Sequence, residues 1–162
     1  MKIKKKLMLV ITISFLCFGC DQGTKTLASN YLPRLEMDSY LNDFLRVGYT
    51  ENMGAFLGIG SSLPSDYHFV AFFVVVSLIL LALLLYIFYS GSLTSKSVVA
   101  LSLLLSGGVS NLFDRFVNDG AVIDFLNIGV GTLRTGIFNL ADIAIVTGAA
   151  LLVVNSKNSS FE

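Results

Sequence analysis

Residues 136–154 read GIFNLADIAIVTGAALLVV, and in this run only the side chains of Asn139 and Asp142 are strongly polar. A run of this length predicts a helix that spans a bilayer, whose hydrocarbon core needs about 20 mainly apolar residues. A carboxylate inside such a helix costs a few kcal/mol, so its presence indicates a function and a partner. The partner that we expect is Asp124, in the sequence AVIDFL just upstream.

Two close carboxylates cannot easily both ionise, so we expect Asp124 and Asp142 to share one proton. The ionised member then acts as a general base and the protonated member as a general acid. A general base and a general acid of this kind can cleave a peptide bond with water. Which aspartate is ionised at rest stays open, because coupled sites titrate as a pair.

The composition also indicates a membrane protein. The chain has 162 residues, of which 54% are hydrophobic and only 14% are charged, well below the average for soluble domains. We expect one domain over residues 1–156 and a disordered tail over 157–162. The formal net charge of +0 and the lack of a basic stripe argue against a nucleic-acid partner. One histidine and two cysteines offer no set of metal ligands, so we expect neither a metal nor a cofactor.

The apolar runs predict an α-helical integral membrane protein with four transmembrane helices. We expect these spans at about residues 7–20, 69–89, 98–113 and 136–154. Residues 32–67 separate the first two spans, and their β-type composition followed by glycines predicts a small sheet or hairpin on the membrane surface. Residues 115–135, before the last span, are expected to form a shorter loop with one turn of helix.

Four lysines among the first six residues predict a cytoplasmic N-terminus, because cytoplasmic ends of spans are enriched in lysine and arginine. Four alternating spans then place both termini inside and residues 32–67 and 115–135 outside. An alternative is that the first apolar run is a signal cleaved at Gly19-Cys20. The residues before Cys20 do not fit a lipoprotein cleavage site, which favours a retained span.

Polar residues recur at helical spacing near the outer end of the third span. Three residues separated by four share one helix face: Gly107, Asn111 and Arg115. Asn139 and Asp142 share a face of the fourth span, so the two faces predict one polar site. We expect Arg115 to pair with Asp114 or to bind a lipid phosphate. For the two asparagines, simple helix–helix hydrogen bonding remains an alternative.

Five motifs occur along the chain in this order: Asp21-Gln22-Gly23-Thr24-Lys25, Asn52-Met53-Gly54-Ala55, Asn111-Leu112-Phe113-Asp114-Arg115, Val122-Ile123-Asp124-Phe125 and Phe138-Asn139-Leu140-Ala141-Asp142. Together they resemble the bacterial lipoprotein signal peptidases (signal peptidase II). The resemblance implies a four-helix aspartyl peptidase of the bacterial inner membrane, with a small periplasmic β-cradle between helices 1 and 2. Its active site would face the periplasm. The enzyme would cut prolipoproteins before a diacylglyceryl-modified cysteine and would be inhibited by globomycin.

The resemblance also implies roles for individual residues. Asp124 and Asp142 match the catalytic pair of the family. The residues that would bind substrate or support the site are Asp21, Lys25, Asn52, Gly54, Gly107, Asn111, Arg115 and Asn139. The implied partners are diacylglyceryl-modified prolipoproteins and membrane phospholipid.

The chain departs from the usual family pattern at four places. Ser110 stands where a glycine is common, Ile143 stands where a serine is common, one small residue is missing before Phe56, and no proline precedes Phe138. These departures spare the aspartates and are expected to affect the cradle and its rim. Two alternatives therefore remain: a proton- or ion-coupled transporter, which the lack of an inverted repeat disfavours, and a catalytically silent lipoprotein-binding relative.

Overall fold

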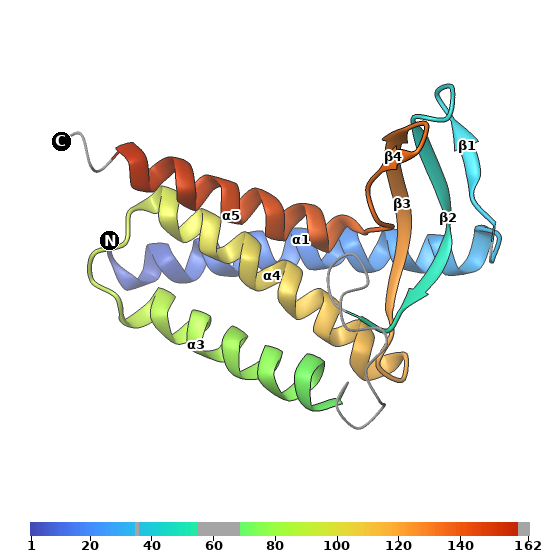
Figure 1. Ribbon diagram of the computed structural model, residues 1–162. Helices are drawn as coiled ribbons and strands as arrows, with labels where there is room; N and C mark the ends of the chain where they lie inside the picture. Colours follow the sequence, from blue (N-terminus) through green and yellow to red (C-terminus); the bar gives the residue numbers. More distant parts are fainter. Residues whose placement is uncertain (35, 55–68, 159–162) are drawn as a thin grey trace.

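The computed structural model describes residues 1–34, 36–54 and 69–158, which form a bundle of long helices with a small sheet at one end (Figure 1). In chain order the elements are α1 (Ile3–Tyr31), β1 (Asp38–Tyr40), β2 (Leu45–Asn52), η2 (Phe69–Val75), α3 (Val76–Tyr89), α4 (Ser95–Val117), β3 (Val122–Val130), β4 (Leu133–Arg134) and α5 (Leu140–Asn158). The π-helical stretch η2 runs directly into α3. The start of α1 and the end of α5 lie at the end of the bundle away from the sheet (Figure 1).

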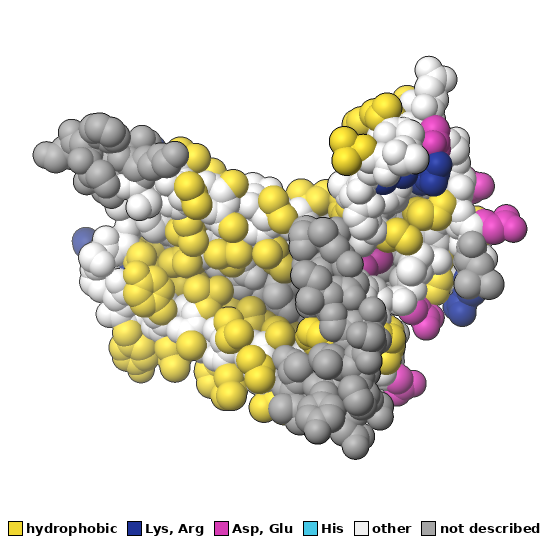
Figure 2. Space-filling model, in the orientation of Figure 1, with side chains coloured by type: hydrophobic (Ala, Val, Ile, Leu, Met, Phe, Trp, Pro, Cys, Tyr) yellow, Lys and Arg dark blue, Asp and Glu magenta, His cyan; other side chains and the backbone are white. Residues whose placement is uncertain are grey.

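The outer surface of the bundle is apolar. Two helical segments of the described residues are long and apolar enough to cross a bilayer, Phe72–Tyr89 and Ser95–Val117, and Leu140–Ser156 forms a shorter apolar helix. Hydrophobic side chains cover the visible face of the helices, whereas acidic side chains gather at the sheet end (Figure 2). Large exposed apolar surfaces mark contact with lipid or protein. This surface agrees with a membrane protein, and the full set of four spans stays a prediction.

Helix α4 lies at the centre and packs against α1, α3 and α5. Glycines allow its close approach to α5, because a Cβ at Gly107 would collide with the carbonyl oxygen of Ala141. A Cβ at Gly148 would likewise lie 2.6 Å from the carbonyl oxygen of Ala100. Small residues at such positions let helix backbones approach each other in membranes. The first turn of α5 is therefore held directly against α4.

One lysine of the N-terminal cluster is used inside the bundle. The side chain of Lys6 is buried, and its Nζ donates hydrogen bonds to the carbonyl oxygens of Ile87 (2.9 Å) and Ser90 (2.5 Å). These carbonyls belong to the last turn of α3 and to its C-cap, where helices leave acceptors unpaired. Lys6 thus fixes α1 to the end of α3.

The sheet has the order β1-β2-β3-β4, with every neighbouring pair antiparallel. Thr50 of β2 lies opposite Asp124 of β3, and the register shifts between Val47 and Thr50. The expectation of a loop with one helical turn over residues 115–135 is wrong, because β3 is a nine-residue strand with a buried first half. Its sequence VIDFLNIGV is rich in β-branched and aromatic residues, which favour strands. Half of the cradle therefore comes from between α4 and α5, and not from between the first two helices.

Element ends also differ from those expected. Helix α1 continues to Tyr31 instead of ending near residue 20, and α5 begins at Leu140 instead of residue 136. Helix α5 reaches Asn158, so the expected tail over 157–162 starts inside a helix. Residues 159–162 lie outside the described residues, as do 35 and 55–67 of the expected outer segment.

Candidate active site

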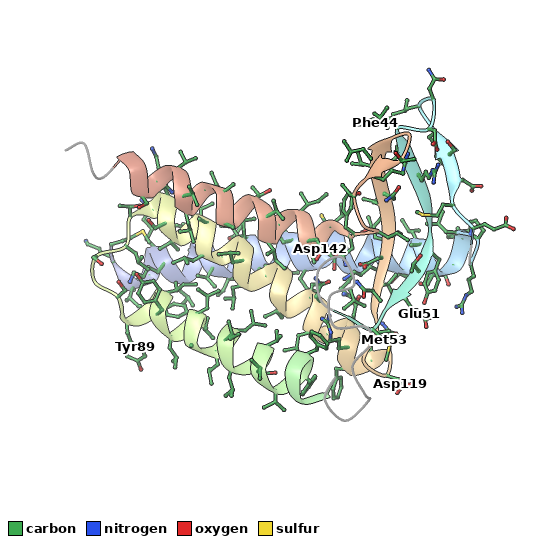
Figure 3. All side chains as sticks on the ribbon, viewed as in Figure 1. Phe44, Glu51, Met53, Tyr89, Asp119 and Asp142 are labelled. Atoms are coloured by element: carbon green, nitrogen blue, oxygen red, sulfur yellow. The ribbon has the colours of Figure 1, made fainter. Side chains whose placement is uncertain are left out.

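The two aspartates singled out by the sequence meet where the sheet joins the bundle. Asp124 lies on β3. Asp142 lies in the first turn of α5, where this helix meets the sheet end of the bundle (Figure 3). Both side chains are buried, with exposed fractions of 2% and 9%. Backbone hydrogen bonds tie the two elements together, because the Phe138 N–H donates to the Leu126 carbonyl (2.8 Å) and the Leu126 N–H donates to the Phe138 carbonyl (2.9 Å).

The start of α5 is a reciprocal cap formed by Asn139 and Asp142. The Asp142 N–H donates to the Asn139 Oδ1 (2.9 Å), and the Asn139 N–H donates to the Asp142 Oδ2 (3.1 Å). This is the geometry of a capping box, in which the N-cap and the third helical residue each satisfy the backbone N–H of the other. The positive end of the helix dipole also lies beside the Asp142 carboxylate. Asn139 therefore fixes the position of Asp142.

Each of the four carboxylate oxygens accepts one N–H hydrogen bond. Asp124 accepts from the Nδ2 of Asn139 (2.7 Å) and from the Nδ2 of Asn52 (2.9 Å). Asp142 accepts from the Nδ2 of Asn111 (3.0 Å) and from the Asn139 backbone. Three asparagines from β2, α4 and the α5 cap thus hold the pair, and Asn139 contacts both members.

The electrostatic surroundings keep Asp124 titratable near neutral pH. Burial raises the pKa of the Asp124 carboxyl to about 7, the charge of Asp142 adds to this effect, and hydrogen bonds from Asn52 and Asn139 oppose it. Among the described residues, no lysine or arginine forms an ion pair with Asp124 or Asp142. A buried carboxyl with only neutral donors can hold a proton at neutral pH.

Arg115 lies at the edge of the pair and does not make the expected ion pair with Asp114. Its Nη2 donates to the Gly54 carbonyl (2.6 Å), its Nη1 donates to the Asn111 carbonyl (3.3 Å), and the guanidinium lies over the ring of Phe72. The Gly54 N–H in turn donates to the Asn52 Oδ1 (2.9 Å), which turns the Asn52 amino group towards Asp124. The Arg115 Nε is buried and has no hydrogen-bond acceptor among the described residues.

A cavity of about 540 Å³ leads from this arginine along the helices. Its walls come from η2, α3, α4 and α5: Phe72, Val76, Gly108, Asn111, Arg115, Asp142, Ile145, Val146, Ala149, Ala150 and Val153. The lining is polar only at the end that holds Asn111, Arg115 and Asp142. A larger cavity of about 680 Å³ lies at the opposite end of the bundle, lined by residues such as Ser92, Lys96 and Asn155, and does not include the aspartates.

Two predicted site residues, Asp21 and Lys25, lie beside the pair in a buried ionic cluster. The Lys25 Nζ is 2.7 Å from the Asp21 Oδ2 and 2.9 Å from the Asp114 Oδ2. An aspartate and a lysine four residues apart, as at 21 and 25, indicate an ion pair on one helix face, and this part of the cluster has a sequence signal. The contact of Asp114 with Lys25 has no such signal and was not expected. Ser110 belongs to this cluster and is buried, so the expectation that this departure affects the rim of the cradle is wrong.

Comparisons with known proteins identify relatives over most of the chain. The model of the family described as "Signal peptidase (SPase) II" matches residues 13–157. The lipoprotein signal peptidase of Chlorobium phaeobacteroides (strain BS1) is 34% identical over 153 residues, covering 86% of this chain and 92% of that protein. The lipoprotein signal peptidase of Borrelia turicatae is 33% identical over 158 residues, covering 93% and 91%.

Two solved structures, both described as bacterial membrane enzymes, have the same fold. One has a TM-score of 0.80 at 27% identity and covers 93% of this chain and 88% of its own. The other has a TM-score of 0.72 at 28% identity and covers 90% of each chain. The sheet and helix arrangement is therefore shared with enzymes of bacterial membranes.

Proposed function

Because the chain belongs to the signal peptidase II family, we propose that it removes signal peptides from prolipoproteins as an aspartyl endopeptidase. Cleavage takes place before the diacylglyceryl-modified cysteine. The observation that carries the proposal is the buried pair Asp124 and Asp142, whose four oxygens are each held by an N–H donor at the end of an apolar cavity.

The pair supplies a general base and a general acid for attack by water. The ionised aspartate takes a proton from water while the oxygen of that water attacks the scissile carbonyl carbon. The protonated aspartate donates a hydrogen bond to the carbonyl oxygen and so stabilises the charge that develops there. As the C–N bond breaks, the leaving nitrogen receives a proton from the pair. The raised pKa of Asp124 suits this shared use of one proton near neutral pH.

The cavity between α3, α4 and α5 is suited to bind a substrate that lies in the lipid bilayer. Its walls are apolar along α5 as far as Val153, as the hydrophobic part of a signal peptide requires, and its polar end lies at Asp142. At that end the Arg115 Nε is buried without an acceptor among the described residues, and we assign it as a donor to a substrate carbonyl or a lipid phosphate. We place the cleavage site of the substrate at this polar end, next to the aspartates.

The topology belongs to the same proposal. Four spans of the inner membrane, with both termini in the cytoplasm, place the sheet and the aspartates on the periplasmic side. Cysteine-accessibility labelling checks this: a cysteine at Ser92, between α3 and α4, should react only after the inner face is exposed. Labelling of that position from the outside would overturn the four-span arrangement.

The activity test is processing of a diacylglyceryl-modified prolipoprotein by the purified protein. We expect cleavage that globomycin blocks, and no cleavage of the same precursor without its diacylglyceryl group. The silent-relative alternative predicts folded protein that binds the precursor and never cleaves it. The transporter alternative predicts no peptidase activity that depends on either aspartate, and no observation on the structure favours it.

A further inference from the structure

Lys25 lies at the centre of a buried cluster that touches the elements carrying both catalytic aspartates. Its side chain is 1% exposed, and its three N–H donors match three acceptors: Asp21 at 2.7 Å, Asp114 at 2.9 Å and the Asn111 Oδ1 at 2.9 Å. An ammonium group has three donors and no acceptor, so Lys25 is fully satisfied. A buried lysine needs such compensation, because an unpaired buried charge is strongly destabilising.

The two aspartates around Lys25 each bind one backbone N–H next to a catalytic residue. The Asp21 Oδ1 accepts from the Ala141 N–H (2.8 Å), and Ala141 immediately precedes Asp142. The Asp114 Oδ2 accepts from the Ile123 N–H (3.0 Å), and Ile123 immediately precedes Asp124. The cluster therefore holds the backbone of α5 and the backbone of β3 in the same way, one residue upstream of each catalytic side chain.

The third contact of Lys25 decides how the Asn111 amide is oriented. An ammonium group can face only the oxygen end of an amide, so Lys25 fixes Asn111 with its Oδ1 towards α1. The Asn111 amino group is then left to donate to the Asp142 Oδ1 at 3.0 Å. The Asn111 Oδ1 also accepts from the Asn139 Nδ2 (3.1 Å), the group that binds Asp124. One ammonium thus orients donors to both members of the pair.

We propose that Lys25 is a positioning residue for the peptidase reaction: it locks the orientation of Asn111 and, through Asp21 and Asp114, the separation of Asp124 and Asp142. The proposal rests on the proposed function. It adds to that function an explanation of why a charged residue, Lys25, is buried outside the substrate cavity. Ser110 and Gln22 reinforce the cluster, since the Ser110 Oγ donates to the Asp21 Oδ2 (2.7 Å) and the Gln22 Nε2 donates to the Asp114 Oδ1 (2.7 Å).

The charge of Lys25 has a second, smaller effect that a packing role would not produce. The charged groups facing Asp124 are Asp142 from α5, Lys25 from α1 and Arg115 from α4, and the neutral groups are Asn52 from β2 and Asn139 from the α5 cap. The hydrogen bonds from Asn52 and Asn139 and the charge of Lys25 lower the pKa of Asp124. Removing the ammonium therefore raises the pH at which the pair loses its shared proton.

The test compares Lys25→Met with the compensated variant Lys25→Met/Asp21→Asn, and uses Lys96→Met as the matched control. Lys96 is exposed at the start of α4, far along the helix from the cluster. Prolipoprotein cleavage is measured per folded protein, as kcat and KM separately and as a function of pH. Folding is followed by thermal unfolding in detergent. If Lys25→Met does not fold, the comparison uses the double variant Lys25→Met/Asp21→Asn alone.

We expect kcat to fall at least about 100-fold in both Lys25 variants, the loss that a misplacement of about 1 Å can cause. KM should stay within about threefold, because Lys25 does not line the cavity. In Lys25→Met the alkaline limb of the pH profile should move to higher pH. If kcat of the folded compensated variant stays within about threefold of wild type, Lys25 only stabilises the fold and the proposal is overturned. Failure of the wild-type protein to cleave would instead contradict the proposed function, so the two failures are distinguishable.

Discussion

Two pairs of buried aspartates lie side by side in this molecule, and they differ in what holds them. Asp21 and Asp114 are 0% and 1% exposed and flank the Lys25 ammonium at 2.7 and 2.9 Å. Asp124 and Asp142 are nearly as buried, and the donors that hold them are asparagine amides and a backbone N–H. The first pair is compensated by a fixed charge and the second is not.

The difference teaches how one residue type serves two purposes in one protein. A carboxylate against an ammonium is an ion pair whose loss costs stability. A carboxylate held only by neutral donors keeps the freedom to bind and release a proton, which general acid–base catalysis requires. We therefore expect substitutions in the second pair to act on turnover alone, and substitutions in the first pair to act on folding and, through the positions of Asp124 and Asp142, also on turnover.

The largest effect is expected from Asp124→Asn and Asp142→Asn. Each substitution keeps the side-chain size and removes ionisation, so each alone should reduce the cleavage rate by several orders of magnitude, measured on purified protein with a modified prolipoprotein. The double variant should be hardly slower than either single one, because residues that act as a unit are strongly non-additive. A single variant that cleaves at near the wild-type rate would exclude the proposed mechanism.

The Asp114→Asn substitution should reduce stability in addition to any loss of turnover. It leaves part of the charge of Lys25 uncompensated in the bundle, and breaking a buried pair costs about 3–5 kcal/mol. Denaturation in mixed micelles measures this loss. The matched control is Asp119→Asn, on the exposed turn after α4, where asparagine tolerates the positive φ of 51° and the change should be within about 0.5 kcal/mol. Equal stability of the two variants would show that the Lys25 cluster is not an energetic unit.

A smaller effect is expected from Arg115→Lys. Lysine keeps the charge and loses the planar fork that reaches the carbonyls of Gly54 and Asn111, so cleavage should weaken by about tenfold without unfolding. Arg46→Lys, on the sheet away from the aspartates, is the control for a general arginine effect. Cleavage by Arg115→Lys as fast as by wild type would exclude a role for the fork.

The pH dependence is the mildest of these effects. The pKa of Asp124 is raised to about 7, so its proton is present below this pH and is lost as the pH rises through it. Because one member of the pair must stay protonated as the acid, kcat/KM should decline above about pH 7. Cleavage that keeps rising well above neutral pH would contradict a shared proton.

The burial of Asp142 beside Asp124 could be predicted from the sequence, because a carboxylate inside an apolar run is costly and therefore informative. The partner Asp124 was expected at the right place, although its setting was not. The local pattern of residues 115–135 predicts a loop and does not reveal strand β3, because the pairing partner β2 lies some 70 residues earlier in the chain. Non-local pairing of this kind leaves little trace in a local pattern.

The ionic cluster was beyond sequence reasoning for a similar reason. The spacing of Asp21 and Lys25 indicates a pair on one helix face, yet nothing local shows that Asp114, 89 residues after Lys25, completes it or that Ser110 donates to Asp21 at 2.7 Å. The cap at Asn139 and Asp142 was within reach, because an asparagine followed three residues later by an acid resembles a helix start. The apolar run, which begins at residue 136, hid that signal.

The most direct measurement of the central claim is a titration of the aspartate carboxyls by NMR in micelles, with carboxyl-labelled aspartate. We predict one carboxyl signal that titrates near pH 7 and is absent in Asp124→Asn. In Asp142→Asn this signal should titrate at lower pH, because the charge of Asp142 helps to raise the pKa of Asp124. If no aspartate titrates above its ordinary range, or if Asp142→Asn leaves the titration of Asp124 unchanged, the two residues do not share a proton and the account is contradicted.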